Sequence, residues 1–391
     1  MRRQNEQLDL PDFLHNSPFL PIGDDFAESY PKHVARPKPT LRQLLKSKPT
    51  RIAIAIIIGF FGFLFLRSRF RNMHVLSRLT GPSCYFSEPQ VPDESYLSQD
   101  VDWSQYAYAL YATNTEYLCN AIMLFETLQR LGSQADRLLM YPNTYSLQDT
   151  SGSAETRLLL KARDEYKVHL APIEIQHENT AYYYGPNWAD SYTKLLAFNQ
   201  TQYKRLIVLD SDSTILRPMD ELFFLPPTPA AMARAYWLPN PTLSSHIIVL
   251  TPSHSSFSLI QAAIKRARYG VYDMEIMNSL FGSHTPCITL PHRIYALLTG
   301  EYRSRDHRPF LDNEEEGEEW NPDMVINDAK FVHFSDYPLG KPWVLGKEEV
   351  WAKAPECRLI SGWEEECRTR DVWLDLYTDF WERRKRVCDS V

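Results

Sequence analysis

Short apolar runs typical of β-strands alternate along this chain with stretches in which apolar residues recur at helical spacing. After the first run, Leu118, Ile122 and Phe125 repeat at helical intervals, and Gly132 ends the pattern. The strand-like runs cover residues 106–112, 137–141, 167–175, 204–209, 230–235, 245–251 and 329–334, and the expected helices cover 118–132, 188–200, 253–268, 274–281 and 371–387. Strands that alternate with helices form βαβ units. We therefore predict an α/β fold, a single Rossmann-like domain with a mostly parallel sheet.

The run at 204–209 ends in two carboxylates that are one residue apart, Asp210 and Asp212. Ligands of such sheets bind beyond the carboxyl ends of the strands, and hard divalent cations prefer carboxylate oxygens. A third ligand is expected from a distant segment, and His333 ends the last strand-like run. An imidazole beside carboxylates favours manganese over calcium. The alternative for His333 is a core histidine at a strand end.

The segment "DSDST" that contains this acid pair also matches the D-x-D-x-T motif of haloacid-dehalogenase-type phosphatases, in which the first Asp is a nucleophile. That motif normally opens its domain, whereas here the βα pattern begins at residue 106, well before Asp210. The later parts of the phosphatase pattern are not evident. A cation site is therefore the favoured interpretation, with a phosphatase or a non-catalytic sugar-binding protein as alternatives.

A second feature, near the N-terminus, is the run of fifteen apolar residues Ile52–Leu66 between Arg51 and Arg67. As a helix it would cover roughly 22 Å at about 1.5 Å per residue, and flanking arginines extend such a span by snorkelling. A signal peptide would lie closer to the N-terminus, and a core helix would have a polar face. We predict a disordered cytoplasmic tail at 1–51, a transmembrane signal anchor at 52–70 and a luminal stem at 71–104.

Charge sets the expected orientation of this anchor. Seven Lys and Arg residues lie at 32–51, before the apolar run, against four at 67–78 after it. The positive-inside rule then keeps the N-terminus cytoplasmic and places residues 105–391 in the lumen, as in a single-pass type II membrane protein. Residues 1–71 hold 12 Lys and Arg against 6 Asp and Glu, and the whole chain carries −7, so the remainder carries −13. A body this acidic argues against nucleic-acid binding.

All six cysteines follow the apolar run: Cys84, Cys119, Cys287, Cys357, Cys367 and Cys388. Disulfides persist in the lumen, and the absence of a C-x-x-C pair argues against a thiolate zinc site. The last three cysteines lie close together in the sequence and are candidates for linking the C-terminal stretch to itself. The "NQT" triplet at Asn199 is a glycosylation acceptor, in agreement with a luminal body.

Five blocks resemble, in order and spacing, glycosyltransferase family 8, the glycogenin-like retaining transferases: "YATNTEYLCNAIMLFETL", "WADSYTKLLAF", "YKRLIVLDSDSTILRPMDELF", "YDMEIMNSLF" and "VHFSDYPLGKPW". Within that family the chain is most similar to the fungal Golgi N-acetylglucosaminyltransferases that cap mannose chains. The resemblance implies a GT-A type transferase domain at 105–391 with a C-terminal helical extension, in the Golgi membrane. It also implies UDP-N-acetylglucosamine as donor, Mn²⁺ or another divalent cation, and a mannose-containing glycan acceptor. UDP-glucose or UDP-galactose is the alternative donor.

The resemblance also assigns roles to residues of this chain. The residues expected to bind the nucleotide sugar are Thr113, Asn114, Tyr117, Lys194, Ser211 and Lys341. The expected metal ligands are Asp210, Asp212 and His333, and the expected catalytic residues are Asp273 and Lys194. Taken alone, Tyr117 is as consistent with a core aromatic, Lys194 with an exposed lysine and Asp273 with a helix cap.

The chain departs from the family pattern in three segments. The usual H-x-x-G-x-x-K-P-W is stretched by two residues between His333 and Lys341, with Gly340 just before the lysine. The glutamine of the D-Q segment is Met274, and an N-S-G-type segment is replaced by "LSSH" at 243–246, where Ser244, Ser245 or His246 would take its place. These departures concentrate around the expected position of the sugar.

Overall fold

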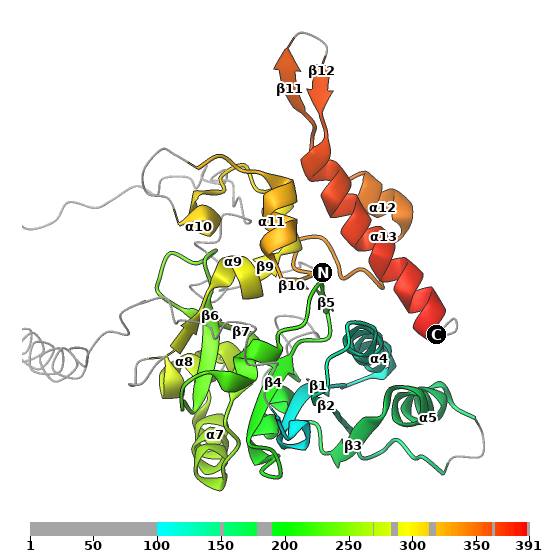
Figure 1. Ribbon diagram of the computed structural model, residues 1–391, viewed down its shortest axis with the longest axis vertical. Coiled ribbons are helices and arrows are strands. Elements are labelled where there is room, and N and C mark those ends of the chain that lie inside the picture. The colour runs from blue at the N-terminus through cyan, green and yellow to red at the C-terminus, as the bar shows by residue number, and fades with distance from the viewer. Residues whose placement is uncertain are drawn as a thin grey trace, which may run out of the picture. The chain divides into compact units, whose positions relative to one another are not determined.

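The computed structural model describes residues 100–148, 152–177, 190–268, 270–282, 288–312, 318–361 and 364–388. They form a seven-stranded sheet with the order β3-β2-β1-β4-β7-β6-β8 and two smaller sheets (Figure 1). The predicted tail, anchor and nearly all of the predicted stem lie outside these residues, as do Cys84, Trp188 and Cys287. Among the residues that are described, no helix combines the length and apolarity that a bilayer crossing requires.

Six strands of the main sheet agree with predicted runs: β1 (Tyr106–Tyr111), β2 (Asp136–Pro142), β3 (Val168–Ile173), β4 (Arg205–Leu209), β6 (Ala230–Arg234) and β7 (Leu243–Leu250). The seventh, β8 (Ile288–Leu290), was not predicted. Neighbouring strands are parallel except that β7 is antiparallel to both β4 and β6. The sheet is therefore mixed. The short connection between β6 and β7 leaves no room for a crossover helix, and without one two neighbouring strands pair antiparallel.

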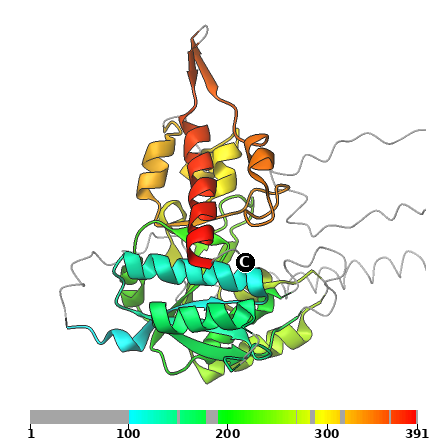
Figure 2. The same cartoon turned by 90° about the vertical axis from the view of Figure 1, so that its right-hand side faces the viewer.

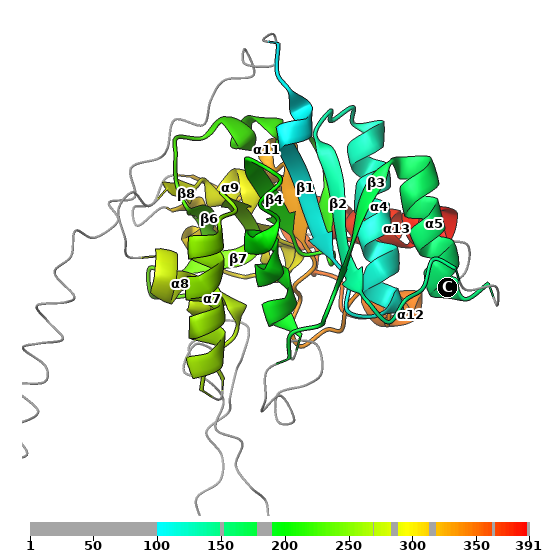
Figure 3. The same cartoon turned by 90° about the horizontal axis from the view of Figure 1, so that it is seen from below.

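Two groups of helices flank the sheet, and each packs over its own apolar core (Figure 3). The helices are α4 (Thr115–Arg130), α5 (Ala154–Tyr166), α7 (His254–Arg266), α8 (Asp273–Phe281), α9 (His292–Tyr295), α10 (Arg308–Leu311), α11 (Pro322–Asp328), α12 (Lys347–Trp351) and α13 (Arg368–Cys388). The 3-10 helices are η2 (Trp103–Gln105), η3 (Ser191–Asn199), η4 (Asp220–Phe224) and η5 (Thr299–Arg303). The helix expected at 188–200 is thus a 3-10 helix over its described part. Apolar spacing does not separate the two helix types over so short a stretch.

A three-stranded sheet next to the main one has the order β5-β10-β9. Its strands are β5 (Ser213–Ile215), β9 (Leu297–Leu298) and β10 (Phe331–His333). β10 pairs antiparallel with β5, which places His333 opposite Ser213. The second small sheet is the hairpin of β11 (Arg358–Ser361) and β12 (Glu364–Glu366), beside the disulfide Cys357–Cys367.

The C-terminal helix α13 reaches back to α4, the first long helix of the domain (Figure 2). A disulfide joins Cys388, at the end of α13, to Cys119 in α4 across a separation of 269 residues. Cys357 and Cys367 do link the C-terminal stretch to itself, as the sequence suggested, whereas Cys388 pairs outside that stretch. The fold places the end of α13 against α4, and the spacing of cysteines along the chain cannot predict a contact between such distant segments.

Candidate functional site

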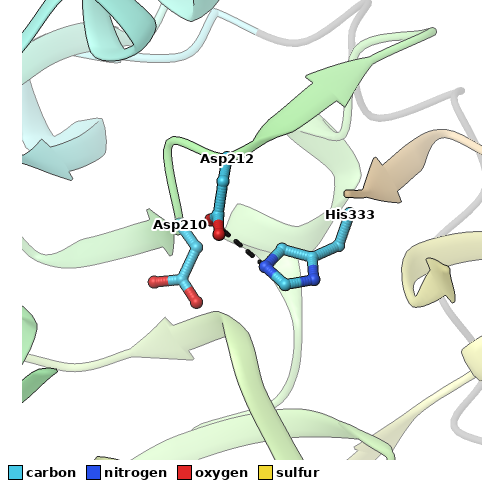
Figure 4. A group of neighbouring side chains, drawn as sticks. All are labelled: Asp210, Asp212 and His333. Carbon is cyan, nitrogen blue, oxygen red and sulfur yellow. Dashed lines mark hydrogen bonds and ion pairs between the residues drawn. The ribbon is translucent and has the colours of Figure 1, made fainter. Parts of the chain in front are cut away.

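The acid pair lies in the short segment that joins β4 to β5, at the carboxyl end of a central strand of the main sheet. Because β5 pairs with β10, His333 comes to lie beside Asp212, with its Nε2 atom 3.1 Å from Oδ1 of the carboxylate (Figure 4). Asp210, Asp212 and His333 each offer a ligand atom within 4.8 Å of the others. The structure thus brings together the three side chains that the sequence suggested as metal ligands.

Each carboxylate of the pair has a lysine of its own. The Nζ atom of Lys194, from η3, lies 2.7 Å from Asp210, and that of Lys341 lies 2.7 Å from Asp212. Lys194 is only 4% exposed, so the interpretation as an ordinary surface lysine is wrong. Lys341 also donates to the carbonyl of Phe334 at 2.6 Å. The lysine therefore reaches the acid pair although its loop is two residues longer than the family pattern.

The two carboxylates differ in their electrostatics. Burial favours the neutral form of both, and in Asp210 it prevails over Lys194 and raises the pKa of that carboxyl. In Asp212, Lys341 and His333 outweigh burial and hold its pKa well below the usual range. Burial opposes the charge of Lys194 as well, but Asp210 and Asp273 raise the pKa of its ammonium group. At neutral pH the site therefore holds Asp212 as an anion and Lys194 as a cation.

Between the two carboxylates, the buried Oγ of Ser211 has no hydrogen-bond partner among the described residues. A buried polar atom without a partner costs about 1–3 kcal/mol, and next to the acid pair a bound donor would supply the missing bond. Two carboxylates with an imidazole form a donor set suited to Mn²⁺ or a similar divalent cation. By this test the residues fit a divalent ion.

The residues predicted to bind the nucleotide base lie at the start of α4. Asn114 is exposed and caps this helix by accepting a hydrogen bond from the backbone N–H of Tyr117 at 3.0 Å, and Thr113 before it is half-buried. The Tyr117 ring packs edge-on against Trp343, with 5.1 Å between ring centroids. Burial raises the pKa of the Tyr117 hydroxyl, and the charges of the acid pair raise it further. The start of α4 and the loop after β10 therefore adjoin next to the acid pair.

Asp273 is the first residue of α8, yet its carboxylate does not cap that helix. It lies 2.9 Å from Nζ of Lys194 and accepts a hydrogen bond from Oγ of Ser245 at 2.6 Å. Ser245 belongs to the "LSSH" segment, which thus reaches the site from β7. Lys194 consequently bridges Asp210, a predicted metal ligand, and Asp273, a predicted catalytic residue.

An aromatic stack supports His333. The imidazole of His246 stacks on it with 5.0 Å between ring centroids, and His246 in turn stacks with Trp237 at 5.8 Å. Ser244 forms a hydrogen bond to Nδ1 of His246 at 2.7 Å. Burial lowers the pKa of His246 well below its usual value, so this ring is neutral. The stack holds the His333 ring in a fixed orientation.

Sequence analysis missed two of these side chains, Tyr111 and Trp237. The hydroxyl of Tyr111 donates to Asp210 at 3.1 Å. Tyr111 lies in the run at 106–112, which was predicted only as a strand, and its place at the carboxyl end of β1 was a usable signal. Asn199, the predicted glycosylation acceptor, is exposed at the end of η3, and its modification stays a prediction.

Comparison with known proteins identifies this chain as a transferase. No family model matches it. It is 46% identical over 307 residues to glucose N-acetyltransferase 1 of Aspergillus fumigatus, and the alignment covers 74% of this chain and 79% of that relative. The chain belongs to this glucose N-acetyltransferase 1 family. It is also 49% identical over 298 residues to the Gibberella zeae protein of that name, of which it spans 64%, less than two thirds of that relative's length. Among solved structures, the bifunctional glycosyltransferase WbbM aligns with a TM-score of 0.45 at 14% identity, over 73% of this chain and 53% of that one.

Proposed function

We propose that this protein is a retaining glycosyltransferase of family 8 that moves N-acetylglucosamine from UDP-N-acetylglucosamine to a mannose-containing glycan. The observation that carries the proposal is the group of Asp210, Asp212 and His333 with a lysine on each carboxylate. Cleavage of a sugar–phosphate bond builds negative charge on the departing diphosphate, and an acidic domain needs local cations to stabilise that charge. This site offers two lysines and a set of divalent-cation ligands at one end of the sheet.

In this proposal Asp210, Asp212 and His333 hold the divalent cation. When bound, the cation neutralises charge on the diphosphate of the donor. Lys341, whose Nζ lies 2.7 Å from Asp212, is beside these ligands and would donate to a phosphate oxygen of the donor. Lys194 holds its position through Asp210 and Asp273 and contacts the donor beside them.

The remaining residues bind and orient the two substrates. Tyr117 and the start of α4 receive the uracil and ribose, and the unpartnered Oγ of Ser211 forms a hydrogen bond to the donor. Asp273, fixed by Ser245 and Lys194, orients a hydroxyl of the sugar or of the acceptor. Retention of the anomeric configuration and the GT-A type architecture follow from the resemblance to family 8.

The proposed location is the Golgi membrane, with the catalytic domain in the lumen. The apolar run Ile52–Leu66 supplies the single membrane span in this proposal. The disulfides Cys119–Cys388 and Cys357–Cys367 support an oxidising compartment, where such bonds persist. The exposed Asn199 agrees with that side of the membrane.

Taken literally, the name of the relatives describes transfer of an acetyl group rather than of N-acetylglucosamine. The site favours sugar transfer, because acetyl transfer from CoA releases a thiol and builds no negative charge on a diphosphate that a cation and two lysines would neutralise. The phosphatase alternative is disfavoured as well, since Asp210 follows the fourth strand of the domain along the chain and is paired with Lys194. An experiment should therefore record which group leaves which donor.

The test uses the purified full-length chain with a mannose oligosaccharide as acceptor. Release of UDP would be followed from UDP-N-acetylglucosamine, UDP-glucose and UDP-galactose, with and without Mn²⁺, and release of CoA from acetyl-CoA in parallel. Asp212→Asn removes one proposed ligand charge, and Asp323→Asn, at an exposed carboxylate of α11 paired with Arg368, is the matched control. We expect Mn²⁺-dependent UDP release that prefers UDP-N-acetylglucosamine, is lost in Asp212→Asn and is kept in Asp323→Asn.

Other outcomes would each contradict a different part of the proposal. A preference for UDP-glucose or UDP-galactose would replace the sugar and leave the reaction class intact. Release of CoA without release of UDP would favour the acetyltransferase. If calorimetry shows that the folded protein does not bind UDP in the presence of Mn²⁺, the protein has no donor site and the proposal is wrong.

A further inference from the structure

A buried carboxylate outside the proposed ligand set lies three residues after His333, where the family pattern has Gly. Asp336 is 3% exposed, and its carboxylate accepts hydrogen bonds from Trp373 Nε1 at 3.1 Å and from the Tyr377 hydroxyl at 2.8 Å. Thr299 Oγ1 donates to it as well. A buried carboxylate with so many donors is held in one orientation, so it fixes the backbone that carries it.

That backbone is the turn that leads from His333 to Lys341. The carbonyl of Asp336 accepts from Leu339 N–H at 2.8 Å and from Arg303 at 3.1 Å. The segment folds back at Lys341, whose Nζ donates a hydrogen bond to the carbonyl of Phe334 and forms an ion pair with Asp212. Asp336 is therefore at the centre of the segment that bears both the proposed imidazole ligand and the proposed phosphate-binding lysine.

The two ring donors to Asp336 come from α13, where positions 373 and 377 lie four residues apart on one face of the helix. The same helix contacts two other segments of the site. Arg383 donates to Thr214 in β5 at 2.8 Å, two residues after Asp212, and Arg384 donates to Asn120 in α4 at 2.6 Å. α13 thus packs behind every segment that contributes to the acid pair, its histidine and the start of α4.

We propose that Asp336 is a positioning residue, through which α13 holds the His333–Lys341 turn in the geometry that binds the cation and the diphosphate. The inference rests on the proposed function, because it concerns the binding of that cation. Outer hydrogen-bond partners orient metal ligands, and loss of such a partner weakens the metal site without removing a ligand. Here the partner acts on the backbone between His333 and Lys341.

The test measures Mn²⁺ affinity directly, in the full-length chain with UDP present. Free Mn²⁺ gives an electron paramagnetic resonance signal that binding removes, so this readout needs no catalysis. Tyr377→Phe deletes one hydroxyl donor to Asp336 and keeps the ring, and Asp336→Asn removes the charge. The matched control is Tyr302→Phe, because the buried hydroxyl of Tyr302 has no hydrogen-bond partner among the described residues. Thermal unfolding would be recorded for every variant.

We expect Tyr377→Phe and Asp336→Asn to raise the half-saturating Mn²⁺ concentration by about 10-fold, the lower end of the effect of outer partners on metal sites. Tyr302→Phe should leave it unchanged. A purely structural role of Asp336 would lower the unfolding temperature but leave the Mn²⁺ affinity of the folded fraction as in the wild type, and that result would overturn the proposal. If Asp336→Asn does not fold, Tyr377→Phe decides alone. A wild-type protein that neither binds Mn²⁺ nor releases UDP would instead overturn the proposed function itself.

Discussion

The buried bridge of Lys194 gives the sharpest prediction for stability. Lys194→Met keeps the length of the side chain and its apolar stem but removes the cation from between Asp210 and Asp273. Loss of one partner from a buried ion pair costs about 3–5 kcal/mol. The Asp210 and Asp273 side chains are 15% and 9% exposed, which gives water some access and favours the lower figure. We therefore expect the free energy of unfolding to fall by about 3 kcal/mol at pH 7, roughly a 100-fold change in the unfolding equilibrium.

Urea denaturation in the presence of a chelator, followed by tryptophan fluorescence, measures this change. Without Lys194 the pKa of the Asp210 carboxyl, already raised by burial, rises further in the folded state, so the variant loses stability as pH rises above about 3.9. The difference from the wild type should accordingly be smaller at pH 4.5 than at pH 7. Lys353→Met, at an exposed lysine, should change the free energy of unfolding by less than about 0.5 kcal/mol. A Lys194→Met protein within 1 kcal/mol of the wild type at pH 7 would refute this account of the bridge, a threshold well below the expected cost.

Three further predictions concern features outside the bridge. Replacing Cys119 and Cys388 together by Ala should lower the free energy of unfolding by about 2–5 kcal/mol in urea, and an unchanged midpoint would show that the disulfide constrains nothing. Burial lowers the pKa of His292, so the folded state resists protonation and stability is lost as pH falls below about 6.5. His292→Gln cannot titrate and should flatten the plot of urea midpoint against pH between 6.5 and 5; an unaltered slope would contradict the assignment. Asn199→Gln should increase the mobility of the expressed protein on a gel to that of the endoglycosidase-treated wild type, whereas equal mobility before treatment would exclude glycosylation at this position.

Much of the fold could be predicted because local patterns determine it. The apolar run Leu206–Leu209 predicts a strand buried on both faces, and the structure has the buried strand β4 there. The helical spacing of apolar residues after Thr115 predicts a helix, and the structure has α4 there. The reversed direction of β7 was not predicted, because its apolar sequence resembles that of the strands that run parallel to one another. Only the length of the connection before Leu243 distinguishes it.

For the site, the sequence identified the side chains better than their surroundings. Asp210, Asp212 and His333 stand at strand ends, where topology predicts convergence, and the structure places them together. The burial of Lys194 could not be predicted, since a lone lysine in a helical stretch is usually exposed. The role of α13 behind the site was equally hidden, because it depends on contacts between distant segments of the chain.

The packing of α13 on α4 has a consequence for the biosynthesis of this protein. The cysteines that join the two helices are 269 residues apart, so α4 is made long before its partner. At about 5–20 residues per second, translation leaves the surface of α4 that α13 covers without its partner for roughly 13–54 seconds. During that interval the nascent chain exposes this surface to chaperones and other chains. A chain that is truncated before α13 therefore has an uncovered face on α4 and lacks the two ring donors to Asp336 in the His333–Lys341 turn.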